Sequence, residues 1–180
     1  MAEPTAGRLG STPMKTLLIV WHSRTGGARR MAQAAAEGAA EEAQVRTRLV
    51  GAEAAGPDDL LAAEAFLFVA PENLAGLSGA MKEFFDRCYY PVLDRIQGRP
   101  YAAMICAGSD GTGALRQITR IATGWRLRPV AEPLIVCTHA QTPEAILAEK
   151  TLSAEDGPLP RARPGARRGP GAGGLLRRGL

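Results

Sequence analysis

Short apolar runs alternate with helix-favouring stretches through the first 150 positions of the chain. Residues 15–21, KTLLIVW, are continuously apolar after the first two positions, as in a strand covered on both faces. Residues 44–50 alternate apolar and polar side chains, which is typical of a half-exposed edge strand. The strands predicted from such patterns are residues 15–21, 44–50, 66–70, 101–107 and, as the middle of a fifth strand, 134–137.

The stretches between these runs predict helices. Ser78 stands where it can cap one helix, and Pro91 is expected to end or bend it. Thr142 and Pro143 open the last helix as its N-cap and first helical residue. The predicted helices are residues 27–43, 58–63, 79–90, 113–122 and a final one from residue 143 onward.

The regular succession of strand and helix predicts an α/β fold, with a doubly wound parallel sheet and helices on both faces. Ligands of such sheets bind outside the carboxyl ends of the strands. The loops that follow the first, third and fourth strands are therefore the expected functional region.

Composition indicates which residue types build the core and which partners the charge of the domain disfavours. Aromatic residues make up 5% of the chain and hydrophobic residues 46%, so we expect a core of Ala, Leu, Ile and Val rather than of rings. The net charge is +4, yet the last 24 residues hold six of the 22 basic groups and none of the 18 acidic ones. Residues 1–156 thus carry a charge of −2, which argues against nucleic-acid binding.

Three cysteines in a chain without a signal peptide indicate reduced core thiols and a cytoplasmic protein. The apolar runs are shorter than the roughly 18 residues that a membrane span needs. We therefore expect no membrane association.

One domain is predicted between two biased ends. Residues 1–13 resemble a disordered leader, residues 14–156 form the domain, and residues 157–180 form a disordered tail built only from Gly, Pro, Arg, Ala and Leu. A frameshifted end would give the same composition, and this alternative stays open.

The loop after the first strand combines hydroxyl and glycine residues immediately before a helix. Such a turn directs side-chain O–H and backbone N–H groups to one point at the positive end of the helix dipole, which suits a phosphate. It lacks both the dinucleotide fingerprint and the nucleotide P-loop, so a monophosphate fits better. An ordinary turn of small residues is the alternative. The predicted contacts are Ser23, Arg24, Thr25, Gly26, Gly27 and Ala28.

Ser23, Thr25 and Gly26 resemble the phosphate loop Ser/Thr-x-Thr-Gly-x-Thr of the flavodoxin family, with Ala28 in place of the last Thr. Residues 70–86, with their Ser-Gly-x-Met-Lys and Phe-Asp elements, are similar to the NADPH-dependent FMN reductases and the WrbA-type NAD(P)H:quinone oxidoreductases. By this resemblance a stretch after the third strand follows the edge of the flavin ring and offers it backbone N–H groups. Its residues are Pro71, Glu72, Asn73, Leu74, Ala75 and Gly76.

The loop after the fourth strand contains three glycines in six residues, so its backbone can approach a flat ligand closely. In the family the corresponding loop packs against the flavin. Its predicted contacts are Gly108, Ser109, Asp110, Gly111, Thr112 and Gly113.

The resemblance implies a flavodoxin-like five-stranded sheet in the order 2-1-3-4-5, FMN as cofactor, NAD(P)H as reductant and a small-molecule electron acceptor such as a quinone, an azo or nitro compound, or a flavin. It also implies a homo-oligomer, as a dimer or tetramer. The flavin loops contain no aromatic residue that could cover the ring, and the domain is only weakly acidic, which favours an oxidoreductase. The alternative is a flavodoxin-like electron carrier or a non-enzymatic flavin-binding protein.

Several other conspicuous side chains have simpler explanations. We expect His22 to make a structural hydrogen bond, and Lys82 and Asp86 to form a solvated pair one helical turn apart. Trp125, with the arginines beside it, either covers the sheet or receives a nicotinamide nucleotide. No Ser-His-Asp arrangement or metal-ligand spacing can be traced in the sequence.

Overall fold

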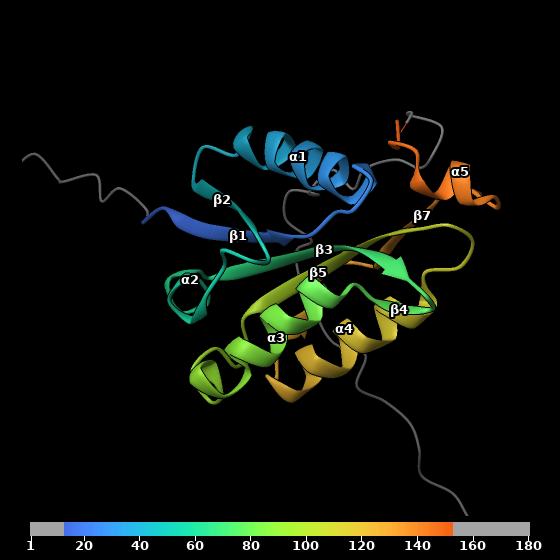
Figure 1. Cartoon of the computed structure of the whole chain (residues 1–180). Coiled ribbons are helices and arrows are strands. Elements are labelled where there is room, and N and C mark those ends of the chain that lie inside the picture. Colours follow the sequence, from blue (N-terminus) through green and yellow to red (C-terminus); the bar gives the residue numbers. More distant parts are fainter. Residues whose placement is uncertain (1–12, 153–180) are drawn as a thin grey trace, which may run out of the picture.

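A computed structural model of the chain describes residues 13–152 (Figure 1). The predicted leader, apart from Pro13, and the predicted tail lie outside the described residues. The sheet runs in the order β2-β1-β3-β5, and two short strands, β6 and β7, pair with the outer side of β5. The strands are β1 (Lys15–Trp21), β2 (Val45–Gly51), β3 (Ala65–Asn73), β4 (Gly76–Leu77), β5 (Pro100–Ala107), β6 (Arg128–Pro129) and β7 (Leu134–Cys137).

All pairings within this path are parallel, and they confirm the predicted order 2-1-3-4-5 when β6 and β7 are counted as one position. The fifth strand is broken in two: β6 pairs with the start of β5, at Pro100 and Tyr101, and β7 pairs with its end. Pro129 and Pro133 flank the gap, and proline cannot donate to a ladder. The break was not predicted.

The helices agree with the prediction to within a few residues, except at the C-terminal end. They are α1 (Gly27–Ala40), α2 (Pro57–Ala62), α3 (Gly79–Val92), α4 (Thr112–Gly124) and α5 (Pro143–Leu147). Thr142 caps α5 as predicted, with its Oγ1 accepting from the backbone N–H of Ala145 at 3.2 Å. This helix has five residues, none of them buried, so it is much shorter than the expected final helix.

The two faces of the sheet are covered differently (Figure 1). One face packs against α2, α3 and α4, and the other against α1 with a contribution from Leu152. Because successive strand residues point to opposite faces, Phe66 and Phe68 enter the first core while Leu67 enters the second.

The core of the α3 and α4 face consists mainly of Ala, Leu, Ile and Val, as expected, but it also gathers six aromatic side chains. Phe68 is fully buried, and its ring contacts five other aromatic rings, with Phe85 at 5.1 Å and Phe66 at 6.0 Å between centroids. Trp125 belongs to the same cluster and donates its indole N–H to the carbonyl of Tyr89. The few aromatic residues are concentrated on one face, which composition alone cannot reveal.

Candidate functional site

The loop between β1 and α1 has the geometry of an anion site. Gly26, at φ 89°, is the N-cap of α1, and its backbone N–H donates to Ser23 Oγ at 3.0 Å. The next three N–H groups, of Gly27, Ala28 and Arg29, have no acceptor within the helix because they belong to its first turn. They add to the positive end of the helix dipole.

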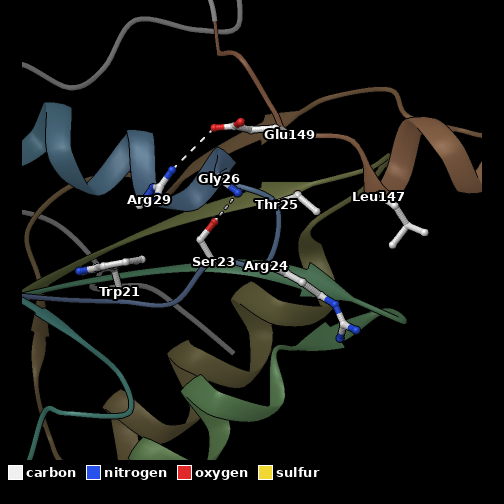
Figure 2. Close-up of a pocket in the computed structure, with 8 residues that line it drawn as sticks. All are labelled: Trp21, Ser23, Arg24, Thr25, Gly26, Arg29, Leu147 and Glu149. Atoms are coloured by element: carbon white, nitrogen blue, oxygen red, sulfur yellow. Dashed lines mark hydrogen bonds and ion pairs between the residues drawn. The ribbon is translucent and has the colours of Figure 1, made fainter.

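A pocket of about 360 Å³ opens beside this loop, within the range of small-molecule sites (Figure 2). Four of the predicted phosphate contacts line it, and Gly27 and Ala28 lie buried behind them. The lining residues are Trp21, Ser23, Arg24, Thr25, Gly26, Arg29, Leu147 and Glu149.

Gly27 is required by the packing behind the pocket. A Cβ at this position would lie 2.5 Å from the Sγ of Cys106 and 3.4 Å from the Cβ of Lys150. The chain after α5 thus packs directly against the loop, and the backbone N–H of Lys150 donates to the carbonyl of Thr25 at 2.7 Å.

Residues 71–76, expected to form an open loop, instead belong to a β-hairpin. β3 continues to Asn73 and pairs antiparallel with β4, through Asn73 with Gly76. The two turn residues, Leu74 and Ala75, have φ of 51° and 60°, a left-handed conformation that is uncommon outside glycine. The Leu74 side chain at the tip is fully exposed.

Glu72 joins this hairpin to the loop after β5. Its carboxylate accepts from the backbone N–H of Gly111 at 2.9 Å and of Ala114 at 3.0 Å, so it satisfies the N-terminus of α4. Gly113 lies so close that a Cβ there would be 2.1 Å from the carbonyl oxygen of Ala75. Two of the three predicted ligand loops therefore pack together as one unit. Gly113 allows this close contact between the two loops.

His22 connects the first loop to the hairpin. Its Nδ1 lies 2.9 Å from Ser78 Oγ, and its Nε2 lies 3.7 Å from a carboxylate oxygen of Glu53. The sequence showed no such Ser-His-carboxylate arrangement, but Ser78 is 1% exposed and cannot receive a substrate. The contact serves instead to hold the start of α3 against the phosphate loop, the structural role expected for His22.

Sequence reasoning missed four residues that line the pocket: Trp21, Arg29, Leu147 and Glu149. Trp21 lies two residues before the predicted contacts and Arg29 directly follows them, so extending the predicted stretch by two residues before and one after would have found both. Nothing in the sequence indicated Glu149, because chain folding alone brings it to the loop.

Metal-ligand clusters and membrane-spanning helices are not found in the part of the chain that the structure describes. Residues 13–152 contain no group of three or more His, Cys, Asp or Glu side chains that could hold a metal ion. Within the same residues, no helix is long and apolar enough to cross a membrane.

The strand order and the site at the carboxyl edge define a flavodoxin-like protein. Structural neighbours support this fold: a flavodoxin described as WrbA-like, from Agrobacterium tumefaciens, has a TM-score of 0.59 at 21% identity and covers 74% of this chain and 88% of its own. An apo NADH:FMN oxidoreductase has the same TM-score at 14% identity, covering 74% of this chain and 83% of its own.

The profile of the NADPH-dependent FMN reductase family matches residues 52–142, and the chain belongs to this family. A flavodoxin of Aquifex aeolicus (strain VF5) is 31% identical over 100 residues, which are 56% of this chain and 54% of that protein. The match thus spans about half the length of that relative. The profile match includes the hairpin and the loop after β5 but not the predicted phosphate loop, residues 23–28.

Proposed function

We propose that this protein binds FMN and uses it to pass two electrons from NAD(P)H to a small-molecule acceptor, such as a quinone, an azo or nitro compound, or a flavin. The observation that carries the proposal is the pocket beside the phosphate loop, at the same sheet edge as the hairpin and the loop after β5. Bound FMN would supply the redox chemistry.

The residues at the pocket suit the phosphate of FMN. The hydroxyls of Ser23 and Thr25, in the turn before α1, and the guanidinium of Arg29, in the first turn of α1, are hydrogen-bond donors. Ala28 supplies no hydroxyl, so backbone N–H groups and Arg29 take a larger share of the binding.

The hairpin and the loop after β5 would position the flavin ring. Glu72 locks the two together before any ligand arrives, so little ordering remains to be done on binding. Neither segment carries an aromatic side chain, and Leu74 at the tip extends into solvent. An uncovered ring face leaves room for a nicotinamide and then for an acceptor, and both require such access.

The similarity to the Aquifex flavodoxin favours a second candidate, a carrier that exchanges electrons with proteins. Stopped-flow reduction separates the two. NAD(P)H should bleach the flavin absorbance of the holoprotein, and benzoquinone should restore it. A flavin that no nicotinamide nucleotide reduces would establish the carrier.

The phosphate end is tested by Thr25→Val, which should weaken FMN binding by about 1 to 3 kcal/mol in a fluorescence titration. Thr123→Val is the matched control, since this exposed hydroxyl donates to the Thr119 carbonyl within α4 and does not line the pocket. FMN affinity equal to wild type in Thr25→Val would rule out this phosphate site.

The open face is tested by Leu74→Trp and Asp110→Trp. Either ring should cover the flavin and slow NAD(P)H oxidation far more than it weakens FMN binding, because the phosphate loop is unchanged. Turnover at the wild-type rate in both variants would contradict an open face at these loops.

A further inference from the structure

The segment after α5 is fixed against the phosphate loop by its backbone. The Lys150 N–H donates to the Thr25 carbonyl at 2.7 Å. The Lys150 ammonium group also donates to three carbonyls at the end of α5, those of Ala145, Ile146 and Ala148. Glu149 therefore lies between Ala148 and Lys150, which these hydrogen bonds hold in place, and this restricts where its side chain can lie.

The Glu149 side chain lines the phosphate pocket (Figure 2). Glu149 Oε1 lies 3.7 Å from Arg29 Nη2 and 3.4 Å from Arg30 Nη2. Its Cγ lies 3.4 Å from where a Cβ on Gly26 would stand. An anionic side chain thus lines a pocket that also holds two arginines and two hydroxyl groups, and it pairs with one of these arginines, Arg29.

A phosphate entering the loop meets this carboxylate. The phosphate must either share Arg29 with the Glu149 carboxylate or displace that carboxylate from Arg29. The phosphate and the carboxylate are both negatively charged, so they repel each other at short distance. The three side chains are about half exposed, so water screens the repulsion without removing it. The carboxylate does not repel the uncharged parts of a ligand in this way.

We infer, building on the proposed FMN site, that Glu149 competes with the ligand phosphate for Arg29 and so sets the affinity of the pocket for phosphate-bearing ligands. Phosphate-free flavin is unaffected by this competition. Glu149 keeps free anions from occupying the loop tightly, and a ligand must add contacts along the hairpin to displace it.

The experiment compares FMN, riboflavin and inorganic phosphate on wild type, Glu149→Gln and Arg29→Gln. Flavin fluorescence reports the first two ligands, and the fluorescence of Trp21, which lines the pocket, reports phosphate. Glu149→Gln should bind FMN and phosphate about 3- to 10-fold more tightly, and Arg29→Gln should bind both more weakly by a similar factor. Riboflavin affinity should not change, and about 0.5 M salt should shrink both effects because the charges are exposed.

Glu144→Gln is the matched control, because Glu144 lies on exposed α5 and does not line the pocket. Equal or weaker FMN binding by Glu149→Gln would overturn the inference and leave the proposed function standing. A change of the same size for riboflavin would also overturn it, because the effect would then be steric. If wild type bound neither flavin, but Glu149→Gln still bound phosphate more tightly, the proposed function would fail and the competition at Arg29 would stand.

Discussion

The two faces of the sheet are built on different principles. The face under α3 and α4 holds an aromatic cluster around Phe68 and closes completely over it. The face under α1 is aliphatic, with Ile19, Met31 and Met104 at its centre, and its only aromatic member among the described residues is half-buried Trp21. The proposed ligand pocket lies beside α1, on this less completely covered side.

The two faces therefore differ in role: the α3 and α4 face mainly stabilises the domain, and the α1 face lies beside the proposed ligand pocket. Large rings remove much apolar surface from water and pack with few voids, so the α3 and α4 face should contribute the larger share of the domain's stability. Beside α1, the five-residue α5 and the segment 148–150 cover the sheet edge with mostly exposed side chains. Such a segment opens at low free energy, which suits the entry of a ligand.

The largest effect is expected at the aromatic cluster. Phe68→Ala should lower the free energy of unfolding by about 3–5 kcal/mol, because it leaves a cavity among five rings. Leu134→Ala on the α1 face should cost about 1–2 kcal/mol, since that side chain is only half-buried. Urea unfolding followed by circular dichroism measures both, and equal losses would contradict the asymmetry.

Gly27→Ala tests the tightest contact on the α1 face. The added methyl group would meet Cys106 Sγ and should cost about 1–3 kcal/mol. Adding Cys106→Ala should recover most of this loss, as a double-mutant cycle would show.

The control in the same helix is Gly38→Ala, where a Cβ meets nothing within 4 Å. It should stabilise the protein by about 0.5–1 kcal/mol through helix propensity. A Gly27 variant as stable as the Gly38 variant would show that the Cys106 side chain moves aside without cost.

Alkaline pH should lower the free energy of unfolding, through a cysteine thiol in the core of the α3 and α4 face. Burial raises the pKa of the Cys88 thiol from 9.0 to about 11, so the folded protein holds this proton more tightly than the unfolded chain. The resulting stability is complete below pH 9 and is lost between about pH 9 and 11, by about 1–2 kcal/mol. Urea unfolding at a series of alkaline pH values should show that Cys88→Ala flattens this part of the stability profile.

The smallest effect is expected at the segment that covers the phosphate loop. Lys150→Met removes the ammonium group that holds the end of α5, yet global stability should change by no more than about 0.5 kcal/mol. Amide exchange of residues 145–150 should become faster. Lys82→Met, which breaks only the exposed pair with Asp86, should leave their exchange unchanged.

Most of the architecture could be predicted from local pattern. Apolar runs of strand length and the stretches between them determined the strand positions and the parallel sheet, because side-chain periodicity acts within a few residues. The turn from Ser23 to Ala28 was recognisable for the same reason, since hydroxyls, glycine and a helix start are neighbours in the chain.

Only the tertiary structure decided what surrounds that turn. The carboxylate of Glu72 reaches the start of α4, His22 reaches Ser78, and Glu149 reaches the arginines of α1 across a separation of 119 residues from Arg30. Local propensity says nothing about such pairs, because each forms only after the sheet brings distant loops to one edge. The sequence by itself determined the fold and led to the proposed place of the site, while the packing of distant segments decided which charges face it.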